Sequence, residues 1–472
     1  MQRSTPSQPL AQALRSRREH LAKLIDFPAI LWSGGDYSRN FPANTYPFRA
    51  SSHFLYFAGL ALKNTVIRLE GGKLELFKDD PPASYALWHG EMPNRDTIAA
   101  TIGADAAFPL AELESRVKNA ATILPQNPIT QTQQFQLLKR SVPLPKAATG
   151  IDLELIKAII TLRSCHDQAA LTELRQAAKI TVEAHKAGMA VTTQAKTEAQ
   201  VRAEMEKVIL SHNTTCSYNS IVTVHGQVLH NEQYFHPLQT GDLLLADVGA
   251  ETPMGWAGDV TRTWPVSGQF SPTQRDIYEI ILAAHDACID QMKPGVEYRD
   301  IHLLAALKIA EGLVDIGILK GQPSDLVEQD AHALFFPHGI GHLLGLDVHD
   351  MEDLGDLAGY EAGRTRSERF GLGYLRLNRP LKAGMLVTIE PGFYQVPAIL
   401  NNPENRKKYQ NVVNWEKLEQ FADVRGIRIE DDVLITETGT EVLTADLPNS
   451  ASQVEALVQS HRYSGDDRRS RR

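Results

Sequence analysis

The sequence predicts an α/β protein of two domains. Its 472 residues exceed the roughly 100–200 residues that one domain usually contains. Short apolar runs typical of strands alternate with segments of helical periodicity, and in the second half four of the apolar stretches carry an acidic residue. We expect domains at residues 1–165 and 166–463, followed by a disordered tail at 464–472.

The composition excludes several classes of protein. An apolar fraction of 43% is ordinary for a globular chain, and a net charge of −9 disfavours binding to nucleic acid. No apolar run approaches the roughly 18 residues of a membrane span, and the N-terminus lacks the apolar core of a signal peptide. The three cysteines are scattered, which is typical of reduced thiols. We therefore expect a cytoplasmic protein that binds neither membrane nor nucleic acid.

The first domain is expected to begin with a helix and then to build a sheet. Its predicted elements are a helix at Ala11–Ile25, strands at Pro28–Trp32, Val66–Leu69 and Leu74–Phe77, and helices at Arg95–Ile102 and Leu110–Lys118. The stretch Tyr46–Gly59 is rich in aromatic residues, which favour strands, so we predict β-structure there as well.

The second domain is expected to open with helices at Gln168–Gly188 and Glu198–Ser211. The stretch Gly241–Pro265 then predicts two strands joined by a Pro-Met-Gly turn, with Asp247 on one and Asp259 on the other. A hairpin would bring the two carboxylates together. Burying two like charges is costly unless a cation lies between them, and a divalent ion is the usual solution.

Three later stretches have the same character. His338–Asp350 (HGIGHLLGLDVHD) contains three histidines among glycines, and Met385–Tyr394 (MLVTIEPGFY) predicts an apolar strand that carries Glu390. Gly426–Thr436 (GIRIEDDVLIT) predicts a strand whose alternation puts Arg428 and Glu430 on one face.

Each feature also has a simpler interpretation. A single acid in a strand usually faces solvent at a sheet edge, and His342 alone could be a hydrogen-bonded core histidine. His338 and His342 have the spacing of a zinc helix, but glycines lie between them and the Glu of H-E-x-x-H is absent. The joint occurrence of the acids and the histidine is what favours a functional site.

Four carboxylates and one imidazole suit two divalent ions that share ligands better than one tetrahedral zinc. Two such ions can hold a water between them, lower its pKa and direct it at an amide or ester carbonyl. Hydrolysis also requires groups that move protons. Imidazoles titrate near neutral pH, so His230, His338 and His349 are candidates for that role.

At these residues the chain resembles the aminopeptidase P and prolidase group of pita-bread metallopeptidases. The motifs are D-x-G, G-D-x-T-R-T, H-x-x-x-H-x-x-G-x-x-x-H-D, E-P-G and R-I-E-D-D, which begin here at Asp247, Gly258, His338, Glu390 and Arg428. The resemblance implies a pita-bread catalytic domain behind a creatinase and aminopeptidase P-like α/β domain. It implies two divalent ions, with Mn²⁺ expected first among those that the donor set accepts.

The resemblance also implies individual roles. Asp247 is expected to bind one ion, His342 and Glu390 the other, and Asp259 and Glu430 both. His230 and His338 are expected near the substrate, His349 in proton transfer, Arg428 in a pair with a carboxylate, and Tyr394 on the wall of the site.

The N-terminal half carries YPFRASSHFLYFAG, which is similar to a motif of aminopeptidase P. In oligomeric relatives this domain reaches a neighbouring subunit's site through an aromatic residue, here Trp88. We therefore expect a homo-oligomer, a dimer or a tetramer. The alternative for Trp88 is a place in the hydrophobic core.

The expected activity is that of an Xaa-Pro aminopeptidase, which releases the first residue of peptides with proline at the second position. The first alternative is an Xaa-Pro dipeptidase, because Met351–Pro380 is longer than in short bacterial aminopeptidases and is closer to prolidases. The second is a non-catalytic pita-bread binding protein, and the presence of all five ligand positions argues against it.

Overall fold

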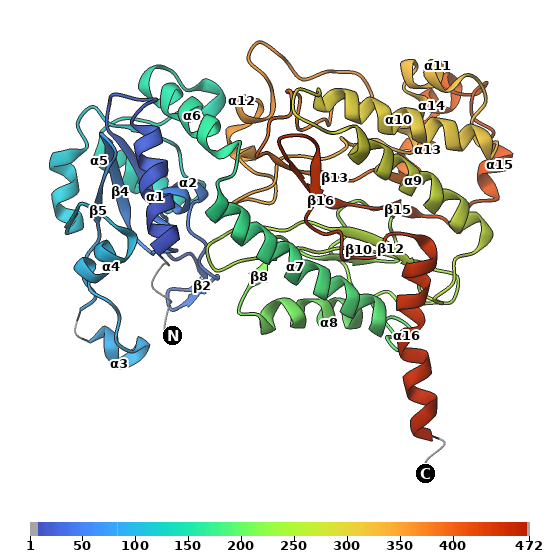
Figure 1. The fold of residues 1–472 in the computed structure, drawn as a ribbon, viewed down its shortest axis with the longest axis horizontal. Helices are drawn as coiled ribbons and strands as arrows, with labels where there is room; N and C mark the ends of the chain where they lie inside the picture. The colour runs from blue at the N-terminus through green and yellow to red at the C-terminus, as the bar shows by residue number, and fades with distance from the viewer. Residues whose placement is uncertain (1–7, 83, 470–472) are drawn as a thin grey trace. The chain divides into compact units, whose positions relative to one another are not determined.

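The structure, a computed structural model, describes residues 8–82 and 84–469 (Figure 1). It divides into two compact units. Unit 1 contains Met1–Glu173, Pro253–Trp256 and Met351–Ala358, and unit 2 contains Leu174–Thr252, Ala257–Asp350 and Gly359–Arg472. Among the described residues, no helix has both the length and the apolar character needed to cross a membrane.

Unit 1 is built on a five-stranded sheet of order β6-β5-β4-β1-β7. Its strands are β1 (Ala29–Trp32), β4 (Val66–Glu70), β5 (Lys73–Phe77), β6 (Ala106–Phe108) and β7 (Ala121–Thr122). The helices are α1 (Gln8–Leu21), α2 (Ser52–Ala58), α3 (Tyr85–His89), α4 (Arg95–Ile102), α5 (Pro128–Leu138) and α6 (Gly150–Arg163). β4 runs antiparallel to β1 and β5, while β6 and β7 are parallel to their neighbours.

The prediction of β-structure across Tyr46–Gly59 is wrong, because its core is the helix α2. Every residue of α2 is buried, so the segment has no polar face from which a helical period could be read. Gly59 ends the helix in the left-handed region at φ 67°, and its N–H donates to the carbonyl of Leu55. Burial of the aromatic side chains outweighed their preference for strands.

Other elements of unit 1 also differ from the expectation. Leu110–Lys118 was predicted to be an α-helix, but it forms a 3₁₀-helix, η1 (Leu110–Arg116). α5 was not predicted, because its sequence PITQTQQFQLL is mostly polar and lacks an apolar stripe. Its start is nevertheless encoded locally: the Asn127 side chain accepts from the N–H groups of Ile129 and Thr130, and Pro128 occupies the first turn.

Unit 2 contains two three-stranded antiparallel sheets, β12-β10-β9 and β13-β16-β17. Their strands are β9 (Ile221–Thr223), β10 (Leu243–Asp247), β12 (Thr261–Pro265), β13 (Leu386–Ile389), β16 (Asp431–Ile435) and β17 (Thr440–Val442). A further pair joins β14 (Gly392–Tyr394) to β15 (Gly426–Arg428).

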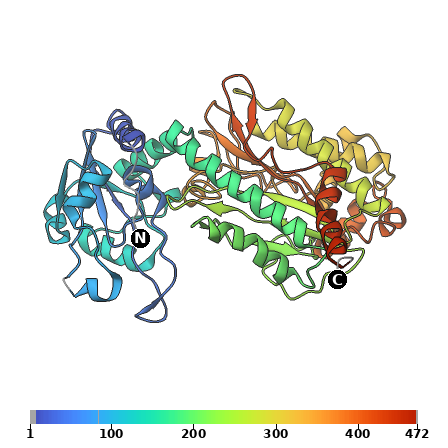
Figure 2. The ribbon, with the colours of Figure 1, turned by 60° about the horizontal axis from the view of Figure 1, so that its bottom comes forward.

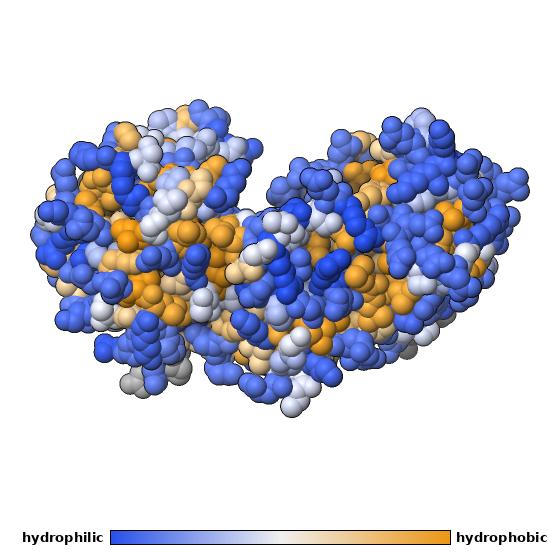
Figure 3. All heavy atoms as spheres, turned by 90° about the horizontal axis from the view of Figure 1, so that it is seen from above, coloured by the Kyte–Doolittle hydropathy of each residue, from blue (hydrophilic) through white to orange (hydrophobic). Residues whose placement is uncertain are grey.

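Long helices flank these strands. They are α7 (Gln168–Val191), α8 (Glu198–Ser211), α9 (Pro272–Gln291) and α10 (Tyr298–Asp315). In both ribbon views α7 and α8 lie along one side of the β10 and β12 strands, and α9 and α10 lie along the other (Figures 1 and 2). On the face drawn in Figure 3, hydrophobic residues gather in patches between larger hydrophilic areas, as on most globular surfaces.

The α16 helix (Ala451–Arg469) includes most of the stretch expected to be a tail, and residues 470–472 lie outside the described residues. Disorder of residues 464–472 therefore remains a prediction.

The predicted strands of unit 2 are interrupted at their acidic residues. The expected strand Met385–Tyr394 divides into β13 and β14 at Glu390 and Pro391, since proline has no N–H for a ladder. Gly426–Thr436 divides into β15 and β16 around Glu430. Asp259 was predicted on a strand but lies two residues before β12. Each of these acids thus stands where regular pairing stops.

Candidate metal centre

Backbone hydrogen bonds bring the candidate ligands together from four segments. Asp247 ends β10, opposite Thr261 at the start of β12. The N–H of Glu430 donates to the carbonyl of Thr261 over 3.0 Å. The N–H of Glu390 donates to the carbonyl of Ile340 over 2.8 Å, and the N–H of Thr388 donates to the carbonyl of His342 over 3.0 Å. These main-chain bonds therefore fix the backbone positions of Asp247, Glu390, Glu430 and His342.

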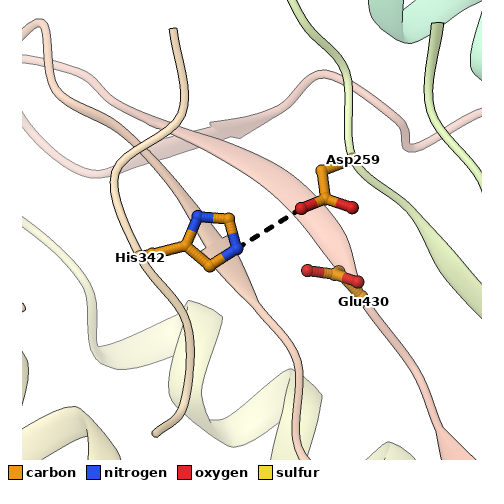
Figure 4. Close-up of side chains that lie close together, drawn as sticks. All are labelled: Asp259, His342 and Glu430. Atoms are coloured by element: carbon orange, nitrogen blue, oxygen red, sulfur yellow. Dashed lines mark ion pairs between the residues drawn. The ribbon is translucent and has the colours of Figure 1, made fainter. Parts of the chain in front are cut away.

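Asp259, His342 and Glu430 form the tightest group. One possible ligand atom from each lies within 4.8 Å of the other two, and the three side chains converge in Figure 4. His342 Nε2 lies 3.3 Å from Asp259 Oδ2 and 3.8 Å from Glu390 Oε1. His342 Nδ1 donates to the carbonyl of Leu343, so Nε2 is the nitrogen that faces the carboxylates.

Tyr218 connects Asp247 to this group, and the sequence analysis missed it. Its hydroxyl oxygen lies 2.5 Å from Asp247 Oδ1 and 2.6 Å from Asp259 Oδ1. One hydroxyl proton can be donated to only one of two ionised carboxylates. The residue lies in CSYNS, which matches no motif, so only the folded chain reveals it.

Arg428 is the cation that faces the carboxylates. Its Nη2 donates to Asp247 Oδ2 over 2.5 Å, and its Nε donates to Thr261 Oγ1 over 2.9 Å. Thr261 Oγ1 in turn donates to Glu430 Oε2 over 2.7 Å. The guanidinium therefore orients one carboxylate directly and a second one through the threonine hydroxyl.

Charge is crowded in this site. Burial raises the pKa of Glu390 to about 7 and the pKa of Glu430 well above its ordinary value, and neighbouring carboxylates add to both effects. Burial also raises the pKa of Asp247, although Arg428 opposes the change. Burial would raise the pKa of Asp259 too, but His342, Tyr218 and His349 together outweigh it and the pKa is lowered. Four carboxylates thus share Arg428 and the nearby histidines.

The residues fit a divalent metal centre. The donors are oxygens and one imidazole, all are buried except the partly buried Glu390, and two carboxylates converge on a single hydroxyl. Carboxylates whose pKa is raised by burial and mutual repulsion are those that a cation would stabilise in the ionised form. The set contains no thiolate, which favours hard or borderline ions.

His338 and Tyr394 form a second polar group beside the ligands. His338 Nδ1 lies 2.8 Å from the carbonyl of Gly339, which can only accept, so Nδ1 carries the proton. Nε2 therefore accepts from Tyr394 Oη over 2.8 Å, and Tyr394 Oη accepts from Arg428 Nη1 over 3.1 Å. Burial lowers the pKa of His338 to about 3, which agrees with a neutral ring.

The remaining candidates lie in different surroundings. The His349 ring packs against His342 with centroids 4.2 Å apart. His230 is exposed in a turn after β9, and among the described residues its side chain makes no hydrogen bond, ion pair or ring contact with the ligands. Trp88 is 80% exposed on α3, so its alternative interpretation as a core residue is wrong.

The acidic pair that follows Glu430 was not given a role by the sequence analysis. Asp432 accepts from the backbone N–H of Asp259 at 3.3 Å. Asp431 faces away and pairs with the fully buried Arg262 over 2.8 Å, while Arg262 Nη1 donates to the carbonyl of Glu430. The two aspartates therefore support the backbone at two candidate ligands.

Comparison with known proteins identifies a family for both parts of the chain. Residues 172–437 match the model of metallopeptidase family M24, and residues 14–126 match the aminopeptidase P N-terminal domain. The Xaa-Pro aminopeptidase of Escherichia coli K12 is 30% identical over 473 residues, covering 96% of this chain and 98% of that protein. The human Xaa-Pro dipeptidase is 30% identical over 476 residues, covering 95% and 94%.

Solved structures resemble the whole chain. Aminopeptidase P from E. coli, solved with the inhibitor Pro-Leu, has a TM-score of 0.78 at 28% identity and covers 98% of this chain and 100% of its own. Aminopeptidase PepP of Pseudomonas aeruginosa has a TM-score of 0.79 at 27% identity, with coverages of 96% and 99%. The expected fold, an aminopeptidase P-type domain followed by a pita-bread domain, is confirmed, and the chain belongs to metallopeptidase family M24.

Proposed function

We propose that this chain is an Xaa-Pro aminopeptidase, a metal-dependent hydrolase that releases the first residue of peptides with proline at the second position. The observation that carries the proposal is the buried group of Asp259, His342 and Glu430, with Asp247 and the partly buried Glu390 beside it, in a chain that matches Xaa-Pro aminopeptidases over both domains. A non-catalytic binding protein would have no need to retain such a costly cluster of buried charges.

Two divalent ions, Mn²⁺ first, would be held by Asp247, Asp259, His342, Glu390 and Glu430, with Asp259 and Glu430 as the shared ligands. Such ions, when bound, supply Lewis-acid chemistry: they polarise a carbonyl and make a nearby water more acidic. The central position of Asp259, which lies near both Tyr218 and His342, supports its role as a shared ligand.

The protein's own groups prepare the site. Arg428 and Thr261 keep two carboxylates oriented, so little reorganisation is needed during the reaction. Neutral His338 is held in one tautomer between Gly339 and Tyr394, which suits a neutral ring that lines a substrate pocket. His349, stacked on His342, is the proposed proton-transfer group.

Proline explains why a dedicated enzyme is needed. The Xaa-Pro bond is a tertiary amide whose ring fixes φ and removes the N–H, so peptidases that bind substrate as an ordinary strand handle it poorly. The proposed substrates are therefore peptides with proline at position 2.

The test is hydrolysis of Arg-Pro-Pro by the purified full chain, with release of free arginine as the readout. Activity should disappear on exhaustive chelation and return with Mn²⁺. Arg-Ala-Ala is the matched control peptide and should be cleaved far more slowly. Activity that survives chelation would contradict metal dependence, and equal cleavage of both peptides would contradict proline specificity.

The second candidate is an Xaa-Pro dipeptidase. It is favoured by the human dipeptidase, which matches this chain as extensively as the aminopeptidases do, and by the long segment 351–380. Comparing Gly-Pro with Arg-Pro-Pro separates the two activities, because a dipeptidase should cleave only the former.

The setting of the enzyme is part of the proposal. We infer a cytoplasmic homo-oligomer, a dimer or tetramer, in which the exposed Trp88 faces a neighbouring subunit's site. The chain is taken to divide into domains at 1–165 and 166–463, with a tail at 464–472. Light scattering of wild type and of Trp88→Ala measures the mass of the assembly, and a peptide assay measures KM. If Trp88 contacts substrate, Trp88→Ala should change KM and leave the mass unchanged.

A further inference from the structure

The segment 224–236, which follows β9, lies beside the candidate site although it contains no helix or strand. Its Leu229 packs against the buried cluster of Ile221, Leu245 and Tyr394, and Tyr394 is the residue that contacts His338 and Arg428. The neighbouring Val228 and Phe235 are exposed by 47% and 68%. The segment therefore joins the site at Leu229, and it also carries exposed apolar side chains and the exposed imidazole of His230.

A single buried carboxylate holds this segment at both ends. Glu198, the first residue of α8, has 0% exposure. Its Oε1 accepts from the backbone N–H of Val224 over 2.8 Å and from Thr223 Oγ1 over 3.0 Å. Its Oε2 accepts from His236 Nδ1 over 2.8 Å and from the His236 backbone N–H over 3.2 Å. Three of the four bonds go to the two ends of the segment and the fourth goes to Thr223, which directly precedes it; none goes to a metal-site residue.

Other contacts complete the anchoring. Within the segment, Asn231 Nδ2 donates to Thr223 Oγ1 over 2.8 Å. Gly226 lies against Gly426, the first residue of β15, so closely that a Cβ on Gly226 would stand 2.8 Å from the Gly426 carbonyl oxygen. Because β15 also carries Arg428, the segment is fixed both to α8 and to the strand that supports the ligands.

Burying a glutamate costs desolvation free energy, which its hydrogen bonds must offset and which an apolar residue would not incur. Here the bonds fix the shape of an irregular, partly exposed segment beside the site. We propose that Glu198 is a positioning residue, whose carboxylate holds segment 224–236 as a rigid wall against which the peptide substrate binds. This inference rests on the proposed peptidase function.

The test compares Glu198→Gln and Glu198→Ala with wild type and with Glu204→Gln, which changes a half-buried glutamate on the same helix that pairs with Lys207. A glutamine amide can satisfy one side of the segment only, because its NH₂ group cannot accept from the other side. Three readouts are needed: KM and kcat for Arg-Pro-Pro, metal content, and amide hydrogen exchange of residues 224–236.

Both Glu198 variants should show a KM roughly tenfold higher or more, faster exchange in segment 224–236, and unchanged metal content and kcat within about threefold. Glu204→Gln should match wild type in all three. Faster exchange with unchanged KM would overturn the inference, because the segment would then be a scaffold and not a substrate wall. Loss of metal would also overturn it, since Glu198 would then support the ligands. If wild type fails to cleave the peptide, the proposed function itself fails, a result distinct from either of these.

Discussion

Tyr218 places one hydroxyl between two carboxylates, so its substitution should affect metal binding. Groups that orient metal ligands through hydrogen bonds typically change metal affinity about 10–100-fold when removed. Tyr218→Phe should therefore weaken Mn²⁺ binding by roughly tenfold or more, as measured by calorimetric titration of the metal-free protein. Tyr234→Phe is the control, because its hydroxyl donates to the Ser220 carbonyl instead. Equal affinities in the two variants would contradict the role of Tyr218.

Asp259 and Asp247 differ in their surroundings and should differ on removal. Asp259 lies near His342 and Tyr218, whereas Asp247 is paired with Arg428. If Asp259 is shared by two ions, Asp259→Ala should lose both, while Asp247→Ala should keep close to one equivalent. Elemental analysis after gel filtration measures this. Retention of a full second equivalent by Asp259→Ala would exclude the shared role.

His332 should make the fold sensitive to acid. Its ring is buried, neither nitrogen has a hydrogen-bond partner among the described residues, and burial lowers its pKa to about 3. Below the ordinary histidine pKa of 6.5, His332 is protonated in the unfolded chain but stays neutral in the folded chain. Stability should therefore fall as pH drops from about 6.5 towards 3, by up to ~1.4 kcal/mol per pH unit.

Replacing this histidine should make the free energy of unfolding depend less on pH. His332→Leu is expected to lose less stability than wild type between pH 7 and pH 5, as measured by urea unfolding of metal-free protein. The exposed His20 offers a control, and His20→Leu should keep the wild-type slope. A variant at His332 with that same slope would show that this ring does not titrate as described.

At the scale of elements, the ion pair of Arg262 and Asp431 joins β12 to β16. Both side chains are almost fully buried, so removing one leaves the other uncompensated. Asp431→Ala should lower the free energy of unfolding by ~3–5 kcal/mol. By contrast, Arg175 and Glu441 form a pair in which each side chain is 43% exposed, and Glu441→Ala should cost ~0–1 kcal/mol. Urea unfolding that ranks the two equally would contradict this difference.

The sequence predicted the elements whose periods are regular and the residues that belong to motifs. The helices α7 and α8 and the antiparallel pairing of β10 with β12 follow from local pattern. α2 did not, because a wholly buried segment shows no amphipathic period. Tyr218 and Glu198 carry no motif, and their roles arise from hydrogen bonds to residues that are distant in sequence or lie on an irregular loop. Such partners are fixed only by tertiary packing.

For the whole molecule, binding of metal should be coupled to stability. A ligand that binds the folded chain and not the unfolded chain stabilises by RT ln(1 + [L]/Kd), about 2.7 kcal/mol at a hundredfold excess over Kd. Mn²⁺ should therefore raise the Tm of metal-free wild type by several degrees. The same addition to Asp259→Ala should leave Tm almost unchanged. A similar rise in both proteins would point to binding elsewhere on the chain.

The order in which the donors occur along the chain has a consequence for synthesis. Asp247 and Asp259 precede Glu430 by more than half of the catalytic unit, and the N–H of Glu430 must find the carbonyl of Thr261. Chains emerge from the ribosome N-terminus first, and earlier domains fold before later ones. Asp247 and Asp259 therefore remain without the other ligands of the centre until β15 and β16 leave the ribosome. A nascent peptidase of this design stays inert until β16 has been synthesised.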